Sequence, residues 1–191
     1  MLLRHLRPAL SLLLVMTILL GLLYPAVITG LAKLLFARAA EGSLIYQDGK
    51  LIGSHLIGQS FTASRYFWGR PSATTPQPYN GVASSGSNLG ALNPALLDQV
   101  KANAKALHDA DPDNRAPIPV ELVTASASGL DPQISPAAAH YQAARVARAR
   151  AIPLPQVEAL IAAHEHGVLL GFLGERRVDV LELNLALDTL H

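Results

Sequence analysis

The stretch SSGSNLGALNP, residues 84–94, carries three serines and two glycines directly before a predicted helix. Such a composition is typical of phosphate-binding loops, because glycines let backbone N–H groups approach an anion. A Walker A loop, however, needs G-x-x-x-x-G-K-[ST]. Here only three residues separate Gly86 from Gly90, Ala91-Leu92 follow them, and G-x-G-x-x-G is absent. The pattern therefore argues against a nucleotide-binding loop and leaves the anion affinity that every helix start offers.

The same hydroxyls raise the alternative of a catalytic serine. A nucleophilic serine needs a nearby base and a group that orients this base. The motifs G-x-S-x-G and S-x-x-K, which supply such settings, are absent around residues 84–87. A second segment, TASASGLDP at 124–132, adds serines and an aspartate without that spacing. We interpret these side chains as helix caps and turn residues. A hydrolase that uses Ser85, Ser87 or Ser128 is kept as an alternative.

Metal binding is the third chemistry to test, at His164-Glu165-His166. Zinc-binding helices use H-E-x-x-H, because that spacing places both imidazoles on one face, whereas residues two apart point to different sides. We interpret the motif as the polar end of a helix and predict no metal site. The chain has no cysteine, which excludes disulfides and thiolate metal sites. Its net charge of +1 gives no electrostatic reason to expect nucleic acid as a partner.

An uncharged apolar run extends from Ala9 to Ala32. It exceeds the roughly 20 residues needed to cross a bilayer. Arg4 and Arg7 precede it and favour a cytoplasmic N-terminus. A cleaved signal peptide is the alternative, but its apolar region normally spans only about 7–15 residues. We therefore predict three parts, which are a cytoplasmic N-terminus (1–8), a transmembrane helix (9–36) and an extracytoplasmic domain (37–191).

The predicted span contains features for packing against other membrane helices. Pro25 removes one backbone donor and predicts a kink. The pairs Thr17/Gly21 and Ala26/Gly30 place small residues four apart, which lets another helix approach closely. These five residues are the candidates for transmembrane packing. A single helix cannot form a transport pathway, so any pore must come from other subunits.

The rest of the chain predicts one mixed α/β domain. Asp48-Gly49 between apolar stretches predicts a β-hairpin, and a Pro/Ser/Thr/Gly-rich segment running through Gly90 is too long for a simple turn. A strand is predicted over 120–126, and 178–187 reads as a buried strand or as a strand turning into a helix. Helices are predicted over 95–108, 137–150 and 156–166.

Two side-chain clusters are left open between core and surface. Tyr66, Phe67 and Trp68 either form part of the core or supply an anchor for a partner, since aromatic residues carry much interface energy. Arg145, Arg148 and Arg150 form a basic set on one predicted helix. This set is either a docking surface or a solvated face.

Several long segments resemble one family, the C subunit of the bacterial Kdp potassium-transporting ATPase. The N-terminal span with Tyr24-Pro25 also matches, and together the segments cover nearly the whole chain in family order. Ala127 and Gln133 depart from the Gly and His that are frequent in the family. The matching segments are GQSFTASRYFWGRPSAT (58–74), YNGVASSGSNLGALNPAL (79–96), LVTASASGLDPQISPAAAHYQAARVARAR (122–150) and LGFLGERRVDVLELNLALD (170–188).

The resemblance implies a non-catalytic, single-pass subunit of the bacterial inner membrane. Its implied partners are a channel-like potassium-binding subunit, a P-type ATPase subunit and a small single-helix subunit, which together couple ATP hydrolysis to potassium import. The family is described as a catalytic chaperone that raises the ATP affinity of the ATPase subunit. No cofactor is expected on this chain itself, and the resemblance implies an involvement of ATP only through the ATPase subunit. An ATP-binding regulatory module is the alternative.

The predicted topology conflicts with direct ATP contact, because ATP is cytoplasmic and residues 37–191 are expected outside. A structural role at the potassium-binding subunit is physically easier. The candidate partner-contact residues are Tyr66, Phe67, Trp68, Arg70, Ser85, Ser87, Asn88, Asn93 and Gln133.

Overall fold

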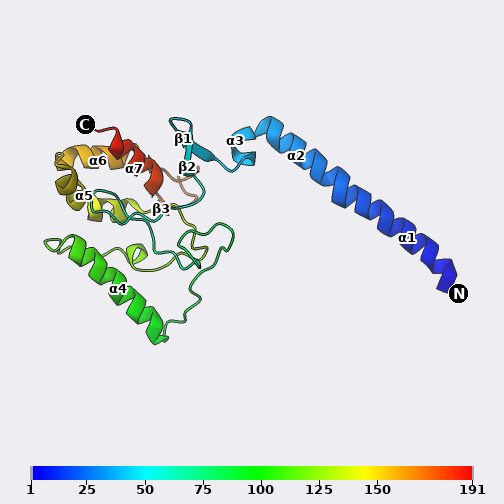
Figure 1. The fold of residues 1–191 in the computed structure, drawn as a ribbon, viewed down its shortest axis with the longest axis horizontal. Coiled ribbons are helices and arrows are strands. Elements are labelled where there is room, and N and C mark those ends of the chain that lie inside the picture. The colour runs from blue at the N-terminus through cyan, green and yellow to red at the C-terminus, as the bar shows by residue number, and fades with distance from the viewer. Residues whose placement is uncertain (1, 191) are drawn as a thin grey trace. The chain divides into compact units, whose positions relative to one another are not determined.

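A computed structural model describes residues 2–190 and divides the chain into two compact units, Met1–Leu44 and Ile45–His191. The first unit is helical and the second is a mixed α/β domain (Figure 1). This confirms the predicted fold class of one long apolar helix followed by a single α/β domain. The division falls close to the predicted start of the domain, whereas the membrane boundaries themselves stay a prediction.

The helical unit begins with α1 (Leu2–Ile18), continues through a π-helical turn (Leu19–Leu23) into α2 (Tyr24–Leu35), and ends with the short α3 (Ala37–Ala40). The apolar stretch Arg4–Leu35 is long enough to cross a bilayer, and none of its most apolar window is buried in the protein. An apolar surface without protein cover is consistent with a single-pass membrane anchor.

The π-helical turn lies directly before Pro25. The N–H of Tyr24 donates to the carbonyl of Leu19, five residues earlier, rather than four. A proline lacks an N–H and its ring crowds the carbonyl four residues earlier, and a widened turn relieves this crowding. The disturbance predicted at Pro25 therefore takes the form of one widened turn.

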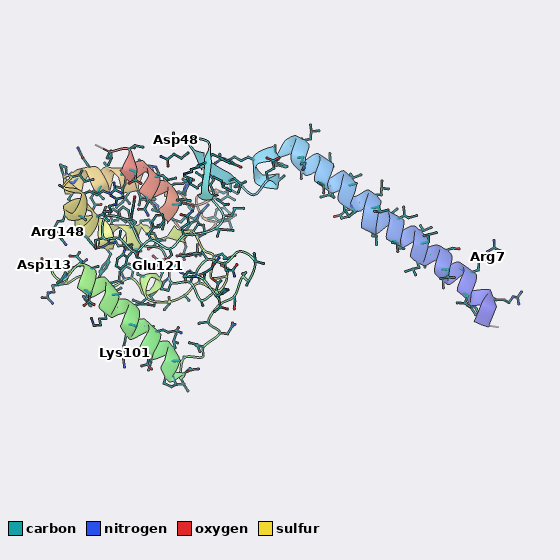
Figure 2. The ribbon with its side chains drawn as sticks, viewed as in Figure 1. Arg7, Asp48, Lys101, Asp113, Glu121 and Arg148 are labelled. Carbon is teal, nitrogen blue, oxygen red and sulfur yellow. The ribbon has the colours of Figure 1, made fainter. Side chains whose placement is uncertain are left out.

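The domain begins with the predicted hairpin, formed by β1 (Leu44–Gln47) and β2 (Lys50–Ser54). Asp48, at its tip in Figure 2, has a φ of 50°, and Gly49 has a φ of 75°. Two successive positive φ values define the tight turn that Asp-Gly favours, which confirms this element.

Two long helices of the domain begin as the sequence predicts. Helix α4 (Pro94–Ala110) is capped by Asn93, whose Oδ1 accepts the N–H of Ala95 at 3.0 Å. Helix α5 (Pro136–Arg150) is capped by Ser135. In both cases the cap satisfies a free N–H and proline occupies the first helical position, where no donor is needed.

The strand predicted over 120–126 is wrong. Residues Val120–Leu122 form a 3-10 turn (η2) instead, and the strand β3 comes later, at Gln133–Ile134. Thr124 Oγ1 donates to the carbonyl of Val120 at 2.8 Å, and Glu121, labelled in Figure 2, accepts the N–H of Ser135 at 2.9 Å. The N–H groups of residues 122–124 also turn back to the carbonyls of Pro119 and Val120, so local bonds give this backbone an alternative to a strand ladder.

The last elements differ from prediction at one helix end. Helix α6 (Leu154–Ala163) stops before residue 166, and Glu165–His166 form the strand β4, so their interpretation as a helix end is wrong. Strand β5 (Arg177–Asp179) leads directly into α7 (Val180–Asp188). Of the two alternatives for residues 178–187, the strand that turns into a helix is therefore the correct one. Asp179 causes the switch, because Oδ1 of its side chain accepts the N–H of Glu182 and caps the helix.

The core lies where α5, α6 and α7 pack around the antiparallel sheet β3-β5-β4. The register pairs Ile134 with Val178 and Glu165 with Val178, so one buried valine is central to the sheet. Small residues on α5 let the neighbouring elements approach closely. The largest fully buried apolar side chains are Phe67, Ile134, Val146, Val157, Ile161, Val178, Leu183 and Leu187.

Candidate functional site

The segment from His55 to Asn93 is fully described and contains no helix or strand beyond an isolated bridge near its start. Ordering such a segment costs much conformational entropy, so it needs many internal bonds. Many of these bonds reach residues 125–131, just before β3. We call residues 69–93 together with 125–131 the loop platform.

Two hydroxyl groups hold the centre of the loop platform. Ser72 Oγ donates to the carbonyl of Gly129 at 2.7 Å and accepts the N–H of Tyr79 at 2.9 Å. Thr74 Oγ1 donates to the carbonyl of Gln77 at 2.7 Å and accepts a further backbone N–H at 3.0 Å. Side chains thus satisfy backbone groups that a helix or sheet would otherwise pair.

Arg70 is fixed within the loop platform by an ion pair. Its Nη1 lies 3.1 Å from Asp131 Oδ2, and its carbonyl accepts the hydroxyl of Tyr79 at 2.6 Å. Burial of Tyr79, followed by the nearby Asp131 carboxylate, raises the pKa of Tyr79 to about 12. Tyr79 therefore acts as a hydrogen-bond donor at neutral pH and is unsuited to be a base.

The stretch that resembles a phosphate loop crosses the second segment closely. The N–H of Ser85 and the hydroxyl of Ser84 both donate to the carbonyl of Ser128, each at 3.0 Å. A Cβ on Gly86 would lie 2.8 Å from the carbonyl oxygen of Ala127, and one on Gly129 would lie 2.6 Å from that of Ser85. The glycines therefore allow two chain segments to cross, which explains them without a ligand.

Two of the three serines suspected of catalysis, Ser85 and Ser128, bond to the backbone, as does the neighbouring Ser126. Ser85 Oγ donates to the carbonyl of Gly86 at 3.1 Å, Ser128 Oγ accepts the N–H of Leu130 at 3.1 Å, and Ser126 Oγ accepts the N–H of Gly129 at 2.9 Å. These contacts match the turn interpretation. Among the described residues, no group of three or more His, Cys, Asp or Glu side chains is placed to hold a metal.

The remaining candidates of the loop platform are partly engaged. Asn88 is exposed with a φ of 51°, and its Nδ2 donates to the carbonyl of Gly86 at 3.2 Å. Ser87 is half-buried and lines a cavity of about 230 Å³ beside α4. Asn93 is occupied as the helix cap, and Gln133 is half-buried in β3. Whether any of them contacts a partner stays a prediction.

Two apolar side chains project from the loop platform. Val82 is 97% exposed and Leu92 is 98% exposed, although the polar bonds described above hold the chain around them. Sequence reasoning concentrated on the polar residues of this segment and missed both. Nothing in their spacing distinguishes them from core residues.

The aromatic cluster divides between core and surface. Phe67 is fully buried, as its core alternative required, so it is unavailable as a partner contact. Asn184 pairs with both backbone groups of Phe67, accepting its N–H at 2.8 Å and donating to its carbonyl at 2.9 Å. Gln142 likewise accepts the N–H of Trp68 at 2.8 Å and donates to its carbonyl at 3.0 Å. Tyr66 is half-buried, and its hydroxyl donates to Asp188 at 3.0 Å.

The basic set of α5 divides between interior and surface, because Arg145 and Arg150 are largely buried whereas the side chain of Arg148 is 56% exposed. Arg145 is 4% exposed, lies 4.5 Å above the ring of Trp68 and donates to Gln142 Oε1 at 2.7 Å. Burial lowers the pKa of Arg145 to about 10, so it remains charged at neutral pH. Arg150 pairs with Asp188 at 2.7 Å, and Arg148, labelled in Figure 2, pairs with Asp111. All three arginines bind other parts of the domain.

A second exposed surface, which was not predicted from the sequence, lies at residues 168–174. We call residues 168–174 the apolar loop. It lies between β4 and β5 and exposes Leu169 (66%), Leu170 (75%), Phe172 (73%) and Leu173 (47%). The signal was present in the sequence, because residues 167–174 contain no polar side chain. A run of exposed large apolar residues marks an interaction surface.

The transmembrane candidates all lie in the helical unit. Thr17 is in α1, Gly21 in the widened turn, and Pro25, Ala26 and Gly30 in α2. Close approach is possible at Gly30, where an added Cβ would meet no atom within 4 Å. Packing of these residues against a membrane partner stays a prediction.

The fold and the surfaces together define a class of protein. It has one helix long and apolar enough to span a membrane, followed by an α/β domain whose loops form its exposed apolar surfaces. The family model described as "KdpC: K+-transporting ATPase, c chain" matches residues 6–189. The chain therefore belongs to the KdpC family.

Close relatives agree along nearly the full length. The chain is 62% identical over 186 residues to the potassium-transporting ATPase KdpC subunit of Methylococcus capsulatus, covering 97% of this chain and 98% of the relative. It is 63% identical to the KdpC subunit of Variovorax paradoxus, covering 95% and 94%. It is 64% identical to that of Polaromonas naphthalenivorans, covering 97% and 94%. The resemblance noted in the sequence is thereby confirmed.

Proposed function

We propose that this chain is an accessory, non-hydrolysing subunit of an ATP-driven, high-affinity potassium uptake complex. The observation that carries the proposal is its match, over nearly the full length, to proteins named as KdpC subunits of potassium-transporting ATPases. The chain would be held in the bacterial inner membrane by its N-terminal helix, with the domain on the extracytoplasmic side. The partners would be a potassium-binding channel-like subunit, a P-type ATPase subunit and a small single-helix subunit.

The loop platform is the surface we assign to the potassium-binding subunit. Its side-chain to backbone bonds give it a fixed shape before any partner binds, which lowers the entropy lost on association. Val82 and Leu92 add exposed apolar surface, and burying this surface against a partner is favourable. A rigid loop with projecting apolar side chains supports a role in assembling or stabilising the complex.

Direct binding of ATP by this domain is the second candidate, and the charge balance at Arg70 disfavours it. Arg70 and Ser72 line a cavity of about 180 Å³. Ligand pockets usually measure about 300–1,000 Å³. This cavity is smaller, whereas a neighbouring open hollow of about 520 Å³, lined by Arg70, Ser128 and Asp131, falls within the range, so volume alone does not decide the question. The charge of Arg70 is already opposed by Asp131. We infer that any effect on ATP affinity, such as the chaperone role described for the family, acts through assembly with the ATPase subunit.

A photoreactive ATP analogue separates these two candidates. We expect no labelling of the purified full-length chain above the level seen in the presence of excess ATP. Labelling that ATP displaces would support direct binding and contradict action through assembly alone.

Growth at limiting potassium tests the proposed function. We expect deletion of the chain to abolish growth at micromolar potassium and to leave growth at high potassium intact. A Val82→Asp/Leu92→Asp variant should reproduce part of this defect, whereas Val120→Asp, at an apolar residue 71% exposed outside the loop platform, should not. Normal growth of the deletion strain at micromolar potassium would contradict the proposal.

Topology and partners require separate measurements. A reporter fused after residue 191 should be active only on the extracytoplasmic side, and cytoplasmic activity would contradict the proposed orientation. An affinity tag on the chain should co-purify a P-type ATPase subunit and a multi-span partner from membranes. The Val82→Asp/Leu92→Asp variant should recover less of the multi-span partner than Val120→Asp does.

A further inference from the structure

We propose that the apolar loop, residues 168–174, inserts shallowly into the lipid surface of the membrane that holds the N-terminal helix. This inference goes beyond the proposed function and depends only on membrane anchoring. The loop would give the domain a second lipid contact in addition to the helix.

The first observation is the composition of the apolar loop and its exposure. Its four large side chains, Leu169, Leu170, Phe172 and Leu173, are between 47% and 75% exposed. The loop contains no hydroxyl, amide or charged side chain. Protein interfaces usually combine apolar anchors with polar groups that fix orientation. A wholly apolar tip fits a fluid apolar medium better, because such a medium needs no directional contacts.

The second observation is that the tip satisfies most of its own backbone donors. The N–H of Leu169 donates to Leu173 at 2.9 Å, and that of Leu173 donates back to Leu169 at 2.9 Å. The N–H groups of Gly171 and Phe172 also donate within the loop, at 3.4 Å and 3.3 Å. Unpaired backbone groups oppose entry into lipid, so an internally bonded turn can enter at lower cost. Positive φ values at Leu170 and Gly171 make this turn possible.

The third observation concerns the charges at the base of the apolar loop. Glu175, Arg176 and Arg177 follow it directly and are exposed. Arg176 pairs with Glu165 at 2.9 Å. Together these four side chains carry two charges of each sign, which suits zwitterionic headgroups and does not require anionic lipid.

The fourth observation is the short connection to the membrane helix. Only residues 36–43 join the end of α2 to the start of β1. At about 3.6 Å per extended residue, such a connection reaches at most about 30 Å. The domain of an anchored chain is therefore restricted to the neighbourhood of a bilayer. This restriction raises the effective concentration of lipid at any apolar surface of the domain.

The test uses the absence of cysteine from the chain. Full-length Phe172→Cys and Val82→Cys variants are labelled with one environment-sensitive fluorophore and reconstituted into phosphatidylcholine/phosphatidylethanolamine vesicles. The matched control, Val82→Cys, is also apolar and exposed but lies on the loop platform. Quenching is measured with nitroxide-labelled lipid and with iodide present on both faces of the membrane. Thermal unfolding of each labelled variant confirms that it is folded.

We expect the probe at residue 172 to be quenched by nitroxide lipid about threefold more than the probe at residue 82, with the opposite order for iodide. Adding anionic lipid should change this ratio little. Equal exposure of both probes to iodide would overturn the proposal. Shielding of residue 172 only after co-reconstitution with the other pump subunits, without quenching by lipid, would also overturn it and would assign the apolar loop to a protein partner.

Discussion

The loop platform and the apolar loop both lack helices and strands, yet they are held in opposite ways. In the loop platform, side-chain hydroxyls bond to the backbone, and that of Ser72 donates to the carbonyl of Gly129, 57 positions away. In the apolar loop, only short-range backbone bonds shape the turn, and its side chains face solvent. The first loop is thus part of the fold, whereas the second depends on the fold only at its base. Substitutions should therefore have unequal effects on stability.

The largest effect is expected for Gly129→Ala in the loop platform. Gly129 has a φ of +67°, and an added Cβ would lie 2.6 Å from the carbonyl oxygen of Ser85. Backbone strain and overpacking together should lower the free energy of unfolding by about 3 kcal/mol or more. Thermal unfolding of the full chain in detergent measures this. Gly90→Ala is the control, because no atom lies within 4 Å of an added Cβ there. Equal unfolding midpoints for the two variants would show that the crossing is loose.

A smaller loss is expected for Thr74→Val. The substitution keeps the shape of a buried side chain, 6% exposed, but removes a hydroxyl that donates to Gln77, accepts the N–H of Asn80 and lies 3.0 Å from Ser72 Oγ. We expect the free energy of unfolding to fall by about 2 kcal/mol. Denaturant unfolding of this variant beside Thr62→Val, at an exposed threonine, provides the measurement. A loss no greater than that of Thr62→Val would contradict the role of this hydroxyl.

A modest effect of opposite sign is expected at Asp179, at the end of β5, the strand that follows the apolar loop. Burial is the main cause that raises the pKa of Asp179 above its unfolded value. The neutral acid therefore fits the fold better, and its contribution to stability is present below the unfolded pKa and is lost as the pH rises through the folded pKa. Asp179→Asn keeps the helix cap without the charge.

Unfolding midpoints between about pH 4 and pH 8 test this expectation. Asp179→Asn should unfold at a higher temperature than the unaltered chain at neutral pH, and the advantage should shrink as the pH falls. An advantage that grows toward acid pH would contradict the direction of the shift.

The smallest effect is expected for Phe172→Gln in the apolar loop. Its ring is 73% exposed, so replacing it should change the free energy of unfolding by less than about 0.5 kcal/mol. Leu183→Ala, at a fully buried leucine, should cost about 2–5 kcal/mol and calibrates the same measurement. A loss above about 1 kcal/mol for Phe172→Gln would show that the apolar loop supports the fold.

Local signals allowed much of the fold to be predicted. Asp48-Gly49 predicted the hairpin, and the cap-plus-proline pairs before α4 and α5 predicted both helix starts, because each signal acts within a few residues. The strand expected over 120–126 did not form, because the N–H groups of residues 122–124 turn back to the carbonyls of Pro119 and Val120, which composition does not reveal.

The candidate surfaces were harder to predict. Arginine is usually a surface residue, and only the contacts of Arg145 with Trp68 and Gln142 show that this one is buried. The opposite error concerns Val82 and Leu92. They are apolar and would be expected in the core, and nothing in the local sequence indicates that they are exposed to solvent. Burial is decided by contacts between distant segments, which periodicity and motifs do not report.

The pairing of Asn184 with the backbone of Phe67 has a consequence for biosynthesis. These residues are 117 positions apart, and the backbone of the fully buried Phe67 is paired only when Asn184 of α7 is in place. A nascent chain that has not yet released α7 from the ribosome cannot close its core. Such long-range contacts form late and slowly. Incomplete chains of this protein would therefore stay open to proteases and chaperones until α7 has been made and released.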